Sequence, residues 1–354
     1  MSGIASEQNL DENDSGDEMM PAELSNLVLQ GLREKWQVSK GDESLPGAGM
    51  GKAIEARWGA QMSDLGLLIE HCQNIGSKFH RSYLKEKSGL YRARSEVLTK
   101  LHIRGCRIAE EVLLLMTQGF AEGALARWRS LFEITVIATL ISEADESLAE
   151  RWLAHEAIDQ KKAMDKQHES ATVLGLEPAE FPETTRISRE YNSAIKRYGD
   201  NFESDYGWAA GQLGFGNRPT FRDLQSGAKQ QAMAYYIKIA NLAAHGSAMT
   251  STDLFHRGDT DPLIPGYRGE QLELVGANMA QTLAQLSSFL IPEPWDFDDI
   301  VEIQIMLRLR NDIVAGLYQT SDQIEADNQS YLAAAVQKSE REQRYRYRKN
   351  KPKN

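Results

Sequence analysis

The stretch that decides the fold is residues 97–115, VLTKLHIRGCRIAEEVLLL, in which apolar side chains recur every three or four residues. That spacing places them on one face of an α-helix, whereas a half-buried strand alternates apolar and polar residues. The same spacing runs through Met62, Leu65, Ile69 and Cys72. Strand-like alternation bounded by turn residues does not stand out anywhere, so the sequence predicts an all-α fold, a multi-helix bundle.

Proline and glycine residues divide the rest of the chain into further predicted helices. A short amphipathic helix is expected from Pro21 to about Gln37, and Thr220 is expected to cap a later helix, with Asp223 three residues on. The other predicted helices span about 121–142, 146–171, a segment ending near 197, 220–248 with a break near 227, 270–290, 297–318 and 321–342.

Composition and charge predict four segments. They are an acidic disordered segment at 1–20, a short helix and linker at 21–51, a main helical domain at 52–320, and a polar helix with a basic tail at 321–354. Residues 1–20 carry a net charge of −6 and residues 341–354 carry +6. These two charges cancel, so the rest of the chain carries about −11, which equals the total. An acidic body is poorly suited to coating nucleic acid, so any such contact should be local.

The cysteines and the apolar runs bear on location. Cys72 and Cys106 are the two cysteines, and neither belongs to a CxxC motif, which favours a reducing cytoplasm and argues against a zinc site. The N-terminus lacks the basic start and apolar run of a secretory signal. Apolar runs stay far below the ~20 residues that span a bilayer. A cytoplasmic protein without membrane contact is therefore expected.

Two charged residues stand out on the helix predicted at 121–142. Arg129 lies within the apolar sector of this helix, and Glu133 lies one turn further at its edge. A charge in such a place must be paired or must face a cavity, since a bare buried charge costs several kcal/mol. Two interpretations follow: an ion pair that locks two helices together, or a binding pocket.

A second polar set lies in residues 235–247, YYIKIANLAAHGS. On a continuous helix Lys238, Asn241 and His245 fall within about 60° of one another, among alanines that allow close approach of a helix or a ligand. The set is compatible with an RNA-cutting site, a ligand pocket, or a buried hydrogen-bond network between helices. We expect it to face the helix that carries Arg129.

Metal and cofactor motifs are weak. The pattern from His155 to Asp159, HEAID, departs at its last position from the HExxH of zinc proteases. Asp165 and His168 are three residues apart, but a di-iron bundle needs two such motifs and further carboxylates. No phosphate-binding P-loop, GxSxG or dinucleotide-binding glycine pattern is found. Neither a metal nor a cofactor is expected.

The basic end of the chain interleaves arginine with tyrosine. Guanidinium and phenol groups pair with phosphates and stack on unpaired bases, whereas the plainer interpretation is a solubilising end. The candidate nucleic-acid contacts are Arg344, Tyr345, Arg346, Tyr347, Arg348 and Lys349.

Several segments together resemble a bacterial family catalogued as domain of unknown function 5677. They are RSLFE at 129–133, YGW at 206–208, TFRDL at 220–224 and the stretch 235–247. The resemblance covers roughly residues 90–290. It implies an all-α fold without an established activity, and gene neighbourhoods of mobile or defence elements.

The stretch 235–247 also resembles, more faintly, the ribonuclease helix of HEPN domains. Those domains place an arginine a few residues before a histidine, twice across a dimer, and cut RNA without a metal. His245 matches the histidine, but Lys238 precedes it in place of an arginine. Lysine lacks the bidentate fork with which arginine grips phosphate.

Two functional hypotheses follow. The first is a non-catalytic binding or sensor module in a bacterial defence or stress setting, which Lys238 and the acidic body favour. The second is a HEPN-like, metal-independent endoribonuclease toxin, which the alignment of Asn241 with His245 and the basic end favour. The partners expected are RNA or a nucleotide, a protein, and a second copy of the chain by family analogy.

Overall fold

The computed structural model describes residues 21–39, 50–85, 92–177, 183–245, 271–291 and 293–349. These residues form ten α-helices and three short 3-10 helices, and no β-strand is found among them. The prediction of an all-α fold is confirmed. The chain divides into two compact units, residues 1–49 and 50–354. The segment 1–20, predicted to be disordered, lies outside the described residues.

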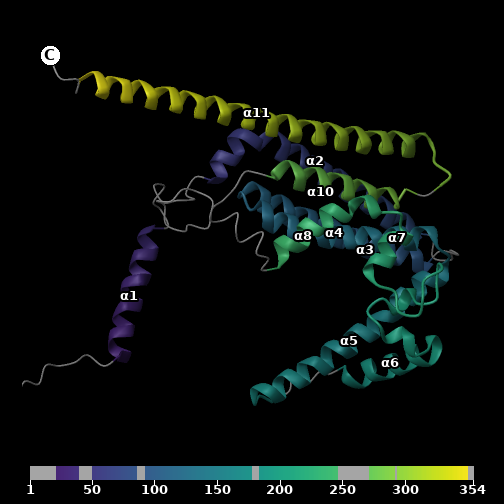
Figure 1. The fold of residues 1–354 in the computed structure, drawn as a ribbon. Coiled ribbons are helices and arrows are strands. Elements are labelled where there is room, and N and C mark those ends of the chain that lie inside the picture. Colours follow the sequence, from purple (N-terminus) through teal and green to yellow (C-terminus); the bar gives the residue numbers. More distant parts are fainter. Residues whose placement is uncertain are drawn as a thin grey trace, which may run out of the picture. The chain divides into compact units, whose positions relative to one another are not determined.

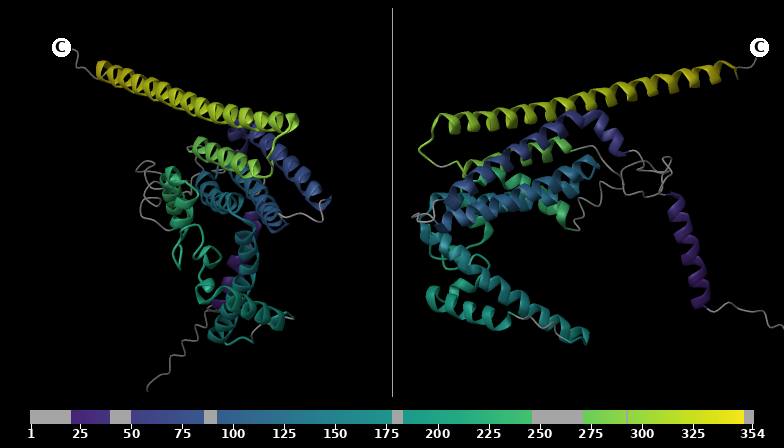
Figure 2. Two further views of the ribbon diagram at one scale, coloured as in Figure 1. Left: turned by 90° about the vertical axis from the view of Figure 1, so that its right-hand side faces the viewer. Right: turned by 180° about the vertical axis from the view of Figure 1, so that it is seen from behind.

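The first unit contains helix α1 (Pro21–Ser39), and the second contains the remaining helices. In Figure 1 and Figure 2, α2 and α10 lie between α11 and the layer formed by α3 and α4. In the described part of the chain, no helix is long and apolar enough to cross a bilayer. The bounds in the second unit are α2 Met50–Lys85, α3 Arg92–Thr117, α4 Ala121–Glu143, α5 Glu146–Leu174, α6 Thr184–Tyr198, α7 Phe221–Gly227, α8 Ala234–Ala244, α10 Leu272–Ser288 and α11 Phe297–Lys349.

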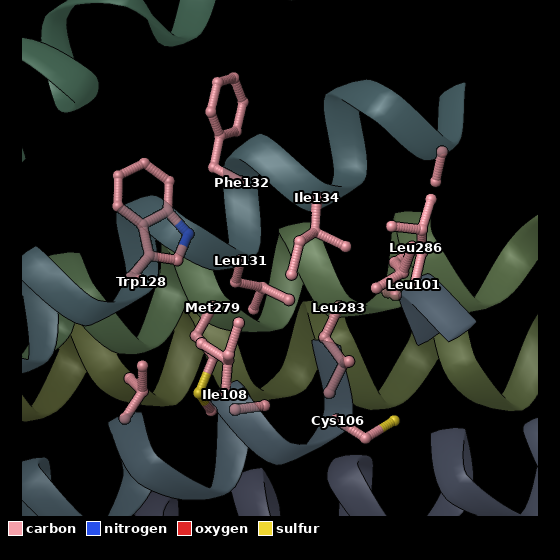
Figure 3. Packing of buried hydrophobic residues seen from close by; sticks show 14 of the residues in the cluster. Leu101, Cys106, Ile108, Trp128, Leu131, Phe132, Ile134, Met279, Leu283 and Leu286 are labelled. Atoms are coloured by element: carbon pink, nitrogen blue, oxygen red, sulfur yellow. The ribbon is translucent and has the colours of Figure 1, made fainter. Parts of the chain in front are cut away.

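Helix α4 is the centre of the core. Its buried side chains cover most of the circumference of the helix, as is typical of a helix with several neighbours. Figure 3 shows Trp128 and Leu131 of α4 facing Ile108 of α3 and Met279 and Leu283 of α10. All five side chains are at most 1% exposed. The core therefore joins helices that are far apart in the sequence.

A buried hydrogen bond fixes α4 against α10. The indole Nε1 of Trp128 donates to the hydroxyl of Thr282 at 3.0 Å. That hydroxyl in turn donates to the carbonyl oxygen of Asn278, one turn earlier on α10, at 2.6 Å. A buried N–H without a partner costs about 1–3 kcal/mol, so this bond favours one register of the two helices.

Two helix ends differ from the sequence-based expectation. The helix predicted to reach about 248 ends at Ala244, because the backbone of His245 is extended, with φ −118° and ψ 154°. The predicted break between 318 and 321 is absent, and α11 is one helix. No glycine or proline interrupts it there, and the apolar face continues from the buried Leu317 to Ile324, which packs against the core.

The start of α7 agrees with the sequence. Thr220 caps the helix: its hydroxyl oxygen accepts from the backbone N–H of Asp223, and the Asp223 carboxylate accepts from the backbone N–H of Thr220 at 2.7 Å. This reciprocal capping box is a local arrangement, which is why three residues of sequence suffice to predict it.

A buried polar network links α2, α3 and α10. His102 Nε2 lies 3.0 Å from the hydroxyl oxygen of Ser287, and the Cys106 sulfur lies 3.7 Å from the same ring nitrogen. Cys72 also hydrogen-bonds to Ser287. Burial raises the pKa of both thiols to about 12 and lowers the pKa of His102 to about 4. The network is therefore uncharged at neutral pH.

The lowered pKa of His102 makes folding sensitive to acid. The unfolded chain binds a proton at His102 with the ordinary pKa of 6.5, whereas the folded chain resists protonation until about pH 4. The contribution to stability is complete above pH 6.5 and is lost as the pH falls towards 4. We expect wild type to lose about 2 kcal/mol more than a His102→Gln variant between pH 7 and pH 5. Denaturant unfolding at both pH values measures this, and equal losses would contradict it.

Candidate functional site

The two charged residues singled out on α4 form an ion pair. Arg129 Nη2 lies 2.8 Å from Glu133 Oε1, one helical turn away. Their side chains are 33% and 26% exposed, so the pair lies at the border between core and solvent. The predicted i,i+4 ion pair is therefore formed. Its partial exposure also leaves room for contact with a ligand.

The pair leaves one donor unused. Arg129 Nε is buried and has no hydrogen-bond partner within the described residues. Burial raises the pKa of Glu133, while the charge of Arg129 opposes this. An unpaired buried N–H costs free energy, so an oxygen atom brought to Arg129 Nε would relieve that cost.

Tyr206 completes the cluster. Burial raises the pKa of Tyr206, the Glu133 carboxylate raises it further, and Arg129 lowers it. The ring of Phe221 lies 6.4 Å from that of Tyr206 and 6.3 Å, edge-on, from that of Phe132. Residues from α4, α7 and the loop before the short 3-10 helix Gly207–Ala209 therefore meet here. We call Arg129, Glu133 and Tyr206 the Arg129 cluster.

The loop that carries Tyr206 is held by α5. Arg151 Nε donates to the carbonyl oxygen of Trp208 at 2.6 Å, and its Nη2 donates to those of Gly207 and Ala210 at 3.1 Å. His155 Nε2 lies 2.9 Å from the carbonyl oxygen of Ser204, to which it donates. The carbonyl groups of Ser204 and Gly207 also accept backbone N–H bonds, so the two side chains add to the hydrogen bonds of the loop itself.

Gly207 is required by this loop. A Cβ atom at position 207 would overlap the carbonyl group of Phe202. Because the obstacle is backbone, it cannot rotate away as a side chain could. This close approach is the physical reason for the glycine between Tyr206 and Trp208 in one of the segments that carry the family resemblance.

The sequence-based reasoning missed Arg151 and His155 as loop anchors. They lie one turn apart on α5, between the buried Leu148 and Ile158. Polar residues within an apolar stripe are the same signal that singled out Arg129 on α4. The same signal on α5 would have singled out Arg151 and His155. It would not have predicted that they bind the loop at 204–210.

The polar residues predicted to share one face of α8 do not form a buried set. The buried residues of α8 are Ile237 and Ala240, whereas Lys238 and His245 are exposed and Asn241 is half-buried. His245 lies beyond the helix end, so its predicted alignment on the helix wheel does not apply. Within the described residues, no hydrogen bond or ion pair joins this set to the Arg129 cluster.

The remaining candidates lie on α5 and α11. His155 Nδ1 is 3.5 Å from Asp159, while its other ring nitrogen holds the loop. Searching the described ranges reveals no group of three His, Cys, Asp or Glu residues suited to a metal ion. The arginines and tyrosines from 344 to 349 belong to the last turns of α11, and residues 350–354 lie outside the described residues.

The chain was compared with family models, curated proteins and solved structures. No curated protein and no solved structure matches the chain. A family model matches residues 95–262, and its description is a family of unknown function, DUF5677. The segments 129–133, 206–208, 220–224 and 235–247 all fall inside this range, so the three parts that meet at the Arg129 cluster belong to the matched region. The resemblance to DUF5677 seen in the sequence is confirmed: residues 95–262 of the chain match the model of that family.

Proposed function

We propose that the chain is a non-catalytic binding or sensor module and that the Arg129 cluster is its ligand site. The observation that carries the proposal is the buried, unpartnered Nε of Arg129 beside a half-open ion pair. A purely structural ion pair satisfies its donors within the protein. A donor kept without a partner at the edge of the core suits a ligand that arrives with an oxygen atom.

The chemistry of the cluster favours a ligand that accepts hydrogen bonds. Arg129 offers Nε to a carboxylate, carbonyl or phosphate oxygen, and arginine is suited to such planar contacts. A tyrosine hydroxyl is protonated at neutral pH, and burial raises the pKa of Tyr206 further, so this hydroxyl can donate a second bond. A nucleotide or a short RNA carries such acceptors, as does an acidic protein side chain.

The position of the cluster supports a sensing role. A ligand held there would touch α4 and the loop fixed by Arg151, so its binding energy would stabilise their present arrangement. The family resemblance motivates a bacterial defence or stress setting and a homodimer. The two buried thiols motivate a cytoplasmic location.

Removing the Arg129 side chain tests the site. We expect a screen of mononucleotides, dicarboxylates and a short single-stranded RNA to contain a ligand that raises the melting temperature of wild type. Arg129→Gln should abolish that rise, since the donor is lost, while shifting the ligand-free stability by less than about 1 kcal/mol.

The matched control is Arg107→Gln, which removes the exposed i,i+4 pair that Arg107 makes with Glu111 at 3.6 Å on α3. It should leave the ligand-induced rise unchanged. If no probe raises the melting temperature of wild type, or if both variants respond equally, the proposed site is wrong.

A second candidate function is metal-independent RNA cleavage at His245. The exposure of Lys238 and His245 favours it, because both side chains can reach a bulky substrate, and Asn241 lies on the same helix. In this reading Arg344, Arg346, Arg348 and Lys349 would help to hold the RNA, Tyr345 and Tyr347 would stack on bases, and a dimer would supply the second histidine.

Incubation of the purified protein with total RNA in EDTA distinguishes the two functions. The binding-module proposal expects no cleavage by wild type, because Lys238 lacks the phosphate fork of arginine and His245 is not held by the helix. Cleavage that disappears in a His245→Ala variant would contradict the binding-module proposal and support the ribonuclease. Cleavage that persists in that variant would point to a contaminant.

A further inference from the structure

A groove of about 530 Å³ lies between α5 and α6, which run side by side in Figure 1. It shares no residue with the Arg129 cluster. We propose that this groove binds a nucleotide through its phosphate groups, as a second site that goes beyond the proposed function. Its volume lies within the range of about 300–1,000 Å³ common for small-molecule sites.

Helix α6 supplies the positive charge. Four of its side chains are cationic and one, Glu190, is acidic, in a chain whose net charge is −11. Arg186, Arg189 and Arg197 line the groove, together with Ser193. Their spacing of three, four and four residues places them on one face of the helix. The helix therefore presents a row of guanidinium groups to the groove.

Arg189 is the guanidinium most available to a ligand. Arg186 pairs with Glu190 at 2.8 Å, and Arg197 pairs with Glu150 at 3.1 Å. Over the described ranges, by contrast, no carboxylate pairs with Arg189, which is exposed. Exposed ion pairs contribute little to stability, so the paired arginines can exchange a carboxylate for a phosphate at small cost.

Two residues that line the groove each carry a buried polar atom without a partner within the described ranges. These atoms are the Gln160 side-chain oxygen and the Tyr198 hydroxyl, for which the described part of the chain offers no hydrogen bond. The amide nitrogen of Gln160 already donates to Glu156 at 3.0 Å, so its oxygen is left to accept from a ligand N–H. Such unsatisfied buried atoms are uncommon and costly.

The Tyr198 ring is fixed in place. It stacks on Phe202 with ring centroids 4.5 Å apart, and the guanidinium groups of Arg151 and Arg197 lie 4.8 and 5.0 Å from its centroid. Because the ring is packed on these groups, the hydroxyl of Tyr198 cannot easily move to another hydrogen-bond partner. A ligand that opens the way to this hydroxyl would gain a donor whose ring is already fixed.

A nucleotide matches all three features of the groove. Its phosphates suit the arginine row, because guanidinium groups bind phosphate oxygens in pairs. The N–H groups on a base edge suit the Gln160 oxygen. The apolar lining suits the flat face of a base, and it is formed by Leu153, Ala154, Ala157 and Ala194.

Calorimetric titration of the full chain with ADP and with GDP tests the proposal. We expect at least one of them to bind at least about tenfold more tightly than inorganic phosphate or the corresponding nucleoside, since each fragment keeps part of the contacts. Arg189→Gln should weaken that binding at least about tenfold, and Tyr198→Phe should weaken it while retaining the ring. The control is Arg104→Gln, which changes an exposed arginine of α3 that does not line the groove.

Three results would overturn the proposal. They are absence of diphosphate binding by wild type, equal affinity for inorganic phosphate and the diphosphates, and equal behaviour of Arg189→Gln and Arg104→Gln. Arg129→Gln should leave diphosphate binding in the groove unchanged. Failure of the groove is thus distinguishable from failure of the Arg129 cluster, whose own ligand test is independent of Arg189.

Discussion

The structure depends on the burial of α4 over most of its circumference. Its side chains Trp128, Leu131 and Leu140 are at most 2% exposed, and each large apolar side chain of this kind stabilises the fold by about 1.5–3 kcal/mol when buried. No single neighbour can cover such a helix, so α3, α8 and α10 pack around it. Arg129 and Glu133 lie where this cover is incomplete, which explains how two charges remain on the central helix of the core.

The same arrangement connects the two candidate sites through α5. Arg151 holds the carbonyl groups of Gly207, Trp208 and Ala210, close to Tyr206 of the Arg129 cluster, and its guanidinium lies over the Tyr198 ring of the groove. Burial lowers the pKa of Arg151, and carbonyl oxygens and ring faces stabilise its charge, with no carboxylate pairing to it among the described residues. The two candidate sites therefore have Arg151 as a common structural neighbour.

The features that could be predicted from the sequence are those that depend on neighbours along the chain. Helical periodicity, the Thr220–Asp223 capping box and the Arg129–Glu133 pair all act within about one turn of helix. The interactions that build the sites join residues far apart in the sequence: the charge of Glu133 acts on Tyr206, and Arg151 bonds to the loop at 207–210. His245 shows the same limit, because its alignment with Lys238 assumed a helix that ends one residue before it.

The central claim is that the Arg129–Glu133 pair is kept for a ligand rather than for stability. The most direct test is the free energy of unfolding of the double variant Arg129→Met, Glu133→Leu, measured without ligand by denaturant titration. A partly exposed pair contributes up to about 1 kcal/mol, and apolar residues of similar size often replace such pairs without loss. The account predicts that the double variant is at least as stable as wild type to within about 1 kcal/mol. A loss of about 3 kcal/mol or more, as when a buried structural network is broken, would contradict it.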